Sequence, residues 1–156
     1  MMKGAGLFIL LVGVGITVGG LLGGKYIIRM LIAGGVLATL SQIVRVRGFT
    51  DFPGTPSGSQ LSILVGGILF EGLLIALVVY MIRERSRKFW LWILFVVGLH
   101  FIVLSFAQGP PLLWLGVVSM ANALIGLGLT NTSYLRFWVI DGLLKIAAGA
   151  WMLYSG

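Results

Sequence analysis

Residues 61–82 read LSILVGGILFEGLLIALVVYMI, and Glu71 is the single charged residue among them. A helix that crosses the hydrocarbon core of a bilayer needs roughly 20 mostly apolar residues. The stretch meets this requirement, and it lacks the alternation of apolar and polar residues that marks a strand of a membrane barrel. It therefore predicts a transmembrane helix.

The same pattern recurs along the whole chain. Apolar runs of this kind occupy residues 5–23, 26–44, 61–82, 89–107, 112–130 and 135–154. Most of the links between them are very short, which makes successive helices antiparallel neighbours in a bundle. The one longer connection, at residues 47–60, is rich in Pro and Gly and predicts a surface loop. We therefore predict an all-α fold, a polytopic integral membrane bundle of six transmembrane helices that forms a single domain over residues 1–156.

The composition supports a membrane protein and excludes several other classes. Hydrophobic residues make up 59% of the 156 residues, charged residues make up 10%, and the mean hydropathy is +1.11. A soluble domain is about a quarter charged, so an ordinary soluble protein is excluded. The chain has no Cys, which excludes a disulfide scaffold, a cysteine nucleophile and an all-cysteine metal site. We expect the lipid bilayer as the main partner, and no cofactor.

The basic residues predict how the bundle is oriented. The net charge is +7, but basic residues at the ends of membrane helices set topology and contact anionic headgroups. We therefore expect no nucleic-acid partner. The stretch at residues 83–88, RERSRK, is the most basic, and Lys3, Arg45 and Arg47 oppose it from the other side. The bias predicts a multi-pass protein of the cell (plasma) membrane with residues 83–88 in the cytoplasm and both termini outside.

Glycine indicates how the helices pack. The chain has 24 Gly residues, and small residues in membrane helices let two backbones approach closely. Gly15, Gly19 and Gly23 form two overlapping small-xxx-small steps in the first run, and Gly34 with Ala38 repeats the step in the second. We predict that these residues pack helices within the chain, with a homo-oligomer or contact with other membrane subunits as the alternative.

A few polar residues lie within the apolar runs, where a charged group costs about 2.5–3.5 kcal/mol on insertion scales. They are Arg29, Glu71, His100, Asn122, Asp141 and Lys145. At 1.5 Å per residue, Glu71, His100 and Asn122 fall near the mid-plane. Asp141 and Lys145 stand four residues apart on one helix face and can neutralise each other.

Glu71 has no such local partner, so it must meet a basic group from another helix or take up a proton. It is therefore our candidate for a proton-handling or cation-binding group. The alternative is a neutral structural network, because the formal charges of the buried groups balance. We expect no metal site, because one His without further ligands at suitable spacing does not make one.

The third and sixth runs contain a similar four-residue sequence, which we call the echo. Residues 71–74 read EGLL and residues 141–144 read DGLL. Six helices divide into two halves of three, and an odd number of helices per half inverts the second half in the membrane. Inverted repeats with polar groups near the mid-plane are typical of secondary transporters, so the echo favours a 3+3 inverted repeat.

One further stretch carries a resemblance. Residues 97–101 read VGLHF and are followed by a short apolar run and a Pro turn. This pattern resembles small uncharacterised bacterial integral membrane proteins with a Gly-Leu-His-Phe helix, and the resemblance covers the fourth and fifth runs. It implies no activity and no functional residues.

Three functions are compatible with these observations. The first is a small transporter or carrier, in which Glu71 and the Asp141/Lys145 pair provide coupling or substrate charge, and His100 and Asn122 orient the ligand. The second is a non-catalytic accessory or assembly subunit of a larger membrane complex. The third and least favoured is a membrane-embedded lipid enzyme, because few acids lie at the interface. We expect a carrier without enzyme activity and without catalytic residues.

Overall fold

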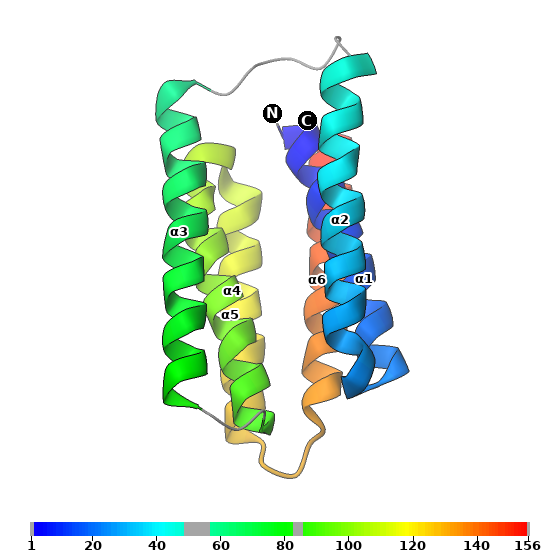
Figure 1. The fold of residues 1–156 in the computed structure, drawn as a ribbon, viewed down its shortest axis with the longest axis vertical. Coiled ribbons are helices and arrows are strands. Elements are labelled where there is room, and N and C mark those ends of the chain that lie inside the picture. Colours follow the sequence, from blue (N-terminus) through cyan, green and yellow to red (C-terminus); the bar gives the residue numbers. More distant parts are fainter. Residues whose placement is uncertain (1, 49–56, 83–85, 156) are drawn as a thin grey trace. The chain divides into compact units, whose positions relative to one another are not determined.

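The structure is a computed structural model that describes residues 2–48, 57–82 and 86–155 (Figure 1). Within these residues the secondary structure consists of helices joined by short connections, and there is no strand. The helices are α1 (Met2–Leu22), α2 (Gly24–Gly48), α3 (Gly58–Met81), α4 (Arg87–Gln108), α5 (Pro110–Gly128) and α6 (Tyr134–Ser155). The predicted all-α fold with six helices is confirmed, and each predicted run coincides with one helix to within about a turn.

Five of these helices are long and apolar enough to cross a membrane over their described residues, namely α1 from Gly4, α3, α4, α5 and α6. Many large apolar side chains are exposed, and in the spanning window of α3 only 6% of the residues are buried. Contiguous apolar surface of this extent is rare on soluble monomers. The helices therefore suit a lipid bilayer, as the composition indicated, and the membrane span of α2 stays a prediction.

The chain divides into two compact units, and the boundary falls inside α6. One unit combines Met1–Pro56 with Trp138–Gly156, and the other is Ser57–Phe137. We call them the α1/α2/α6 unit and the α3/α4/α5 unit, and each is described by itself. The connection at residues 47–60 and the basic stretch at residues 83–88 lie partly outside the described residues, so the side of the membrane that they face stays a prediction.

In the α1/α2/α6 unit, α1 and α2 form an antiparallel hairpin whose turn is Gly23. This residue has φ +101°, a region that side chains rarely adopt, and its carbonyl accepts a hydrogen bond of 2.9 Å from the N–H of Tyr26. A Cβ at Gly23 would meet no atom within 4 Å. Gly23 therefore makes the turn, whereas we had expected it to pack two helices.

In the α3/α4/α5 unit, α4 joins α5 through Gly109, which has φ +97°, and Pro110 then begins α5. Proline is well suited to the first helical position because its missing N–H would be unpaired there anyway. The start of α3 is fixed by a capping box between Ser57 and Gln60. Gln60 also donates through Nε2 to the carbonyl of Ala107 at 3.3 Å, which ties the start of α3 to the end of α4.

Candidate functional site

The polar residues predicted within the membrane belong to both units and are described unit by unit. Glu71 and His100 meet between α3 and α4, Asn122 lies on α5, Asp141 and Lys145 pair on α6, and Arg29 stands apart on α2.

The contact between Glu71 and His100 joins α3 to α4. Nδ1 of His100 lies 3.5 Å from Oε2 of Glu71 and 3.0 Å from the carbonyl oxygen of Gly67. Gly67 and Glu71 are one turn apart on α3, so a backbone carbonyl and a carboxylate face the same ring nitrogen. The His100 side chain is 8% exposed and that of Glu71 is 24% exposed. The cluster is therefore a shielded imidazole beside a more accessible acid.

Gly67 makes this approach of α4 to α3 feasible. It is the buried residue of α3, and a Cβ there would lie 3.0 Å from Cδ2 of Leu104 and 3.6 Å from Cε1 of His100. An added Cβ would crowd the Leu104 side chain and would stand in ordinary contact with the ring. Gly67 was not among the expected packing glycines, because it stands outside any small-xxx-small step that we considered.

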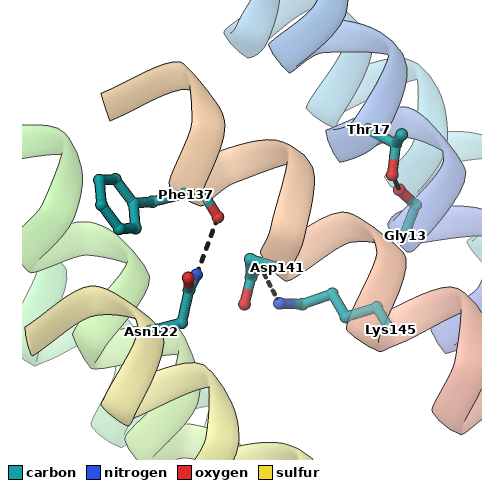
Figure 2. Close-up of polar contacts among 6 residues, drawn as sticks. All are labelled: Gly13, Thr17, Asn122, Phe137, Asp141 and Lys145. Atoms are coloured by element: carbon teal, nitrogen blue, oxygen red, sulfur yellow. Dashed lines mark hydrogen bonds and ion pairs between the residues drawn. The ribbon is translucent and has the colours of Figure 1, made fainter. Parts of the chain in front are cut away.

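The second cluster is an ion pair within α6. Nζ of Lys145 donates to Oδ2 of Asp141, and both side chains are fully buried (Figure 2). The second carboxylate oxygen, Oδ1, is buried and has no hydrogen-bond partner among the described residues. A buried pair of this kind is strongly destabilising when one partner is removed, because the other charge stays behind uncompensated.

Helix α1 packs its backbone directly on the turn of α6 that carries this pair. A Cβ at Gly13 would lie 2.9 Å from Cβ of Lys145 and 2.8 Å from the carbonyl oxygen of Gly142. On the facing side, a Cβ at Gly142 would lie 2.7 Å from the N atom of Thr17. The Thr17 hydroxyl donates to the carbonyl of Gly13 at 2.9 Å (Figure 2). The ion pair is thus enclosed from the α1 side by backbone and small residues.

The same contact repeats two turns away. A Cβ at Gly6 would lie 2.8 Å from the carbonyl oxygen of Gly149, and a Cβ at Gly149 would lie 2.6 Å from that of Gly6. Gly6 and Gly13 face Gly149 and Gly142 in reverse order, so the two helices run antiparallel. We call these four residues the glycine seam. In the sequence, the two glycines of the seam on each helix are seven residues apart. A search for glycines four residues apart does not find them.

The glycines that we did predict lie mainly between α1 and α2. A Cβ at Gly15 would lie 2.5 Å from the carbonyl oxygen of Met30 and 3.0 Å from Cα of Gly34. Gly19 similarly lies close to Ile27 and Met30. These contacts hold the hairpin together through the backbone, as expected where small residues replace larger ones in membrane helices.

Asn122 and Arg29 have simpler surroundings. Asn122 is buried, and its Nδ2 donates to the carbonyl of Phe137 at 2.8 Å (Figure 2), which ties α5 to the first turn of α6. Arg29 is exposed on α2. Neither residue is joined to Glu71 or His100 by a described hydrogen bond or ion pair.

Arg87 has a role that sequence reasoning missed. Its Nε donates to the carbonyl of Thr132 at 2.9 Å, and one terminal nitrogen donates to the carbonyls of Gly126 and Leu129. The last carbonyls of a helix have no partner within that helix, and a cation is favourable at that end. Arg87 therefore caps α5 from the start of α4, although its place in a basic stretch suggested only a topology signal.

Comparison with known proteins gives a family. One family model, for a family of unknown function (DUF6609), matches residues 1–156. The chain belongs to this DUF6609 family. No curated protein and no solved structure matches the chain. The expected resemblance to an uncharacterised family agrees with this membership, while the Gly-Leu-His-Phe pattern itself stays a prediction.

For this DUF6609 member, the described residues contain no group of three His, Asp or Glu side chains that could hold a metal ion. Asp141 and Lys145 already neutralise each other on one helix, whereas Glu71 and His100 come from two helices, and Glu71 keeps part of its side chain exposed. The Glu71/His100 cluster is therefore the candidate functional site.

Proposed function

We propose that the protein is a small carrier of the cell membrane that exchanges a cation against a proton at Glu71 and His100. The observation that carries the proposal is the contact of 3.5 Å between Oε2 of Glu71 and Nδ1 of His100. Ionisable residues inside membrane helices are expensive, and they typically mark ion pathways and proton relays. Here such an acid faces the only histidine of the chain and keeps 24% of its side chain exposed.

The charge of the site explains why a cation and a proton would compete. A Glu71 carboxylate beside a neutral imidazole carries one negative charge, and a net charge is unfavourable at membrane depth. One proton or one monovalent cation neutralises it, and both together would leave a positive site. Competition between two ions for one site is the minimum that an exchanger needs.

The remaining polar residues support the frame around this site. Asp141 and Lys145 balance each other within α6, and Asn122 ties α5 to α6. In the proposed carrier the ion pair holds α6 against α1 through the glycine seam. Coupling of this pair to the substrate charge, and orientation of the ligand by Asn122, remain part of the proposal.

The proposal includes the 3+3 inverted repeat, which transporters use for alternating access. Each half would begin with an antiparallel hairpin that crosses at a glycine pair. Gly15 meets Gly34 between α1 and α2, and a Cβ at Gly116 would lie 2.7 Å from the carbonyl oxygen of Gly98 between α4 and α5. These crossings and the EGLL/DGLL echo support the repeat, and superposition of the two halves in an experimental structure would test it.

The proposed orientation places residues 83–88 in the cytoplasm and both termini outside. It is supported by the antiparallel glycine seam, because Gly6 lies beside Gly149. The N-terminal end of α1 and the C-terminal end of α6 therefore lie at the same end of the α1/α2/α6 unit.

The test uses inside-out membrane vesicles that contain the full chain and that are acidified by respiration. A fluorescent amine reports the pH gradient, and Na⁺, K⁺ or tetraphenylphosphonium is then added. We expect at least one of these cations to collapse the gradient in vesicles with the protein and not in empty ones. Glu71→Gln should abolish the response, and Ser62→Ala, an exposed position on the same helix, should retain it.

The opposite result is equally informative. If none of the three cations moves protons, the carrier proposal falls for this chemistry. If the gently extracted protein then elutes in a fixed ratio with another membrane protein, the accessory-subunit alternative replaces it.

A further inference from the structure

We infer that His100 is the group that binds the proton in the Glu71/His100 site, and that it binds it at Nε2. The inference rests on the proposed function, because it names the atom that holds the proton in the proposed exchange. The geometry on which it depends is nevertheless independent of transport.

The first step concerns Nδ1. This nitrogen lies 3.0 Å from the Gly67 carbonyl oxygen and 3.5 Å from Oε2 of Glu71. A carbonyl oxygen and a carboxylate oxygen can only accept hydrogen bonds. A bare Nδ1 would bring three lone pairs together, so Nδ1 carries the hydrogen and donates it. This holds for the neutral ring as well as for the charged one.

The second step concerns Nε2. A neutral imidazole has one N–H and one nitrogen with a lone pair, so a hydrogen on Nδ1 leaves the lone pair on Nε2. No described residue forms a hydrogen bond with Nε2. An added proton therefore binds to the lone pair of Nε2, and Nδ1 keeps its hydrogen throughout. The charge of the site changes from minus one to zero.

The third step compares His100 with Glu71 as the group that binds the proton. Glu71 faces an N–H donor, and a carboxylate is the stronger acceptor for such a donor when it is ionised. The imidazolium that forms keeps the hydrogen bond to the Gly67 carbonyl and places a positive charge beside the Glu71 carboxylate. A proton on Glu71 would weaken the contact, so the geometry favours the ring.

Within the described residues of this unit, Glu71 contacts the ring, and the other charged residues, Arg87, Lys88 and Arg136, lie at the starts of α4 and α6. Helix α5 carries no titratable residue, and α3 carries only Tyr80 besides Glu71 among its described residues. On α4 itself, the nearest charged residues, Arg87 and Lys88, precede His100 by twelve residues or more, about 18 Å along the helix axis. Glu71 is thus the charged group of this unit that faces the ring.

The experiment uses the full chain in lipid bilayers and ¹⁵N-labelled histidine. The chain contains one His, so solid-state NMR gives one pair of ring nitrogens. At alkaline pH we expect Nδ1 protonated and Nε2 unprotonated. On acidification Nε2 should gain a proton while Nδ1 stays protonated. Ser62→Ala, a change on the exposed side of α3, should give the same spectrum.

A second isotope label shows whether the proton binds to Glu71 instead. Glu84→Gln leaves Glu71 as the only glutamate, so a ¹³C-labelled carboxyl reports its ionisation alone. The inference predicts that this carboxyl stays ionised while the ring is titrated. A neutral ring with hydrogen on Nε2, or conversion of the Glu71 carboxyl to the acid while the ring stays neutral, would overturn it.

His100→Gln links the spectroscopy to exchange in vesicles. The glutamine amide can donate to the Gly67 carbonyl, so the contact between helices is retained, but the amide cannot bind the proton. We expect loss of the proton-dependent response with an unchanged melting temperature. If wild-type vesicles show cation-driven exchange but NMR finds the hydrogen of the neutral ring on Nε2, the assignment of the proton to Nε2 is refuted and the carrier proposal stands. If NMR finds the expected ring states but wild-type vesicles show no exchange, the carrier proposal is refuted and the assignment of the proton stands.

Discussion

Replacing Gly149 by alanine tests the glycine seam between α1 and α6. The added Cβ would lie 2.6 Å from the carbonyl oxygen of Gly6, 2.7 Å from the N atom of Leu10 and 2.8 Å from its Cβ. Ordinary contacts begin near 3.4 Å, and two of these three neighbours are backbone atoms that cannot rotate away. The helices must therefore separate by several tenths of an ångström along the seam.

The size of the effect follows from two opposing terms. Overpacking of this kind costs about 1–3 kcal/mol, and the rigid neighbours put Gly149 at or slightly above the upper end. Alanine is the better helix former by about 1 kcal/mol. The net loss should be about 2 kcal/mol, which is roughly a 30-fold shift in the unfolding equilibrium. The assay is reversible unfolding in mixed detergent micelles, followed by tryptophan fluorescence.

The matched control is the same substitution where space is open. A Cβ at Gly66 would meet no atom within 4 Å, so Gly66→Ala should leave stability unchanged or raise it by up to about 1 kcal/mol. Equal stability of Gly149→Ala and the wild type would refute the seam. Equal losses in Gly149→Ala and Gly66→Ala would show that glycine acts through flexibility and not through close packing.

Two further predictions concern charges, and a third concerns the membrane topology. Lys145→Met leaves the buried Asp141 carboxylate without its partner and should destabilise the protein by about 3–5 kcal/mol. Adding Asp141→Leu should restore most of that loss in the same unfolding assay. If the second substitution restores no stability, the role of the pair is contradicted. Arg87→Gln removes the hydrogen-bond donors to the end of α5 and should lower the free energy of unfolding by about 1–3 kcal/mol. Lys88→Gln, at an exposed neighbouring residue, should have little effect. Equal losses of stability in the two variants would argue against the cap. Because the chain has no Cys, Ser155→Cys introduces a single thiol, which an impermeant maleimide should label in intact cells. Labelling only in inside-out vesicles would place the C-terminal end of α6 in the cytoplasm.

The helices were predictable because their signal is local. A run of apolar residues reports its own length and ends, and residues 61–82 agree with α3 at Gly58–Met81 to within a turn. The Asp141/Lys145 pair was predictable for the same reason, since a spacing of four residues places both on one helix face. Neither prediction depends on which helices pack against each other.

The contacts between helices could not be predicted in the same way. Hydropathy is similar for every run, so it cannot indicate that α1 packs against α6, and the partner of Glu71 was left open between several basic groups. Gly23 illustrates the ambiguity at one residue. Its spacing from Gly19 is that of a packing step, while its place next to Gly24 and Lys25 is that of a turn, and the positive φ decides for the turn. The role of Arg87 likewise could not be predicted without knowing that the end of α5 lies beside the start of α4.

The glycine seam has a consequence for the order of assembly. Among the described helices α1 is synthesised before all others, and α6, which covers Gly6 and Gly13, is synthesised after all others. Helices α3, α4 and α5 are consecutive, so their contacts can form while synthesis continues. A nascent chain released before α6 would present an uncovered glycine face and would lack both charges of the buried pair. Synthesis of α6 is therefore the step at which Gly6 and Gly13 are covered and the buried ion pair is supplied.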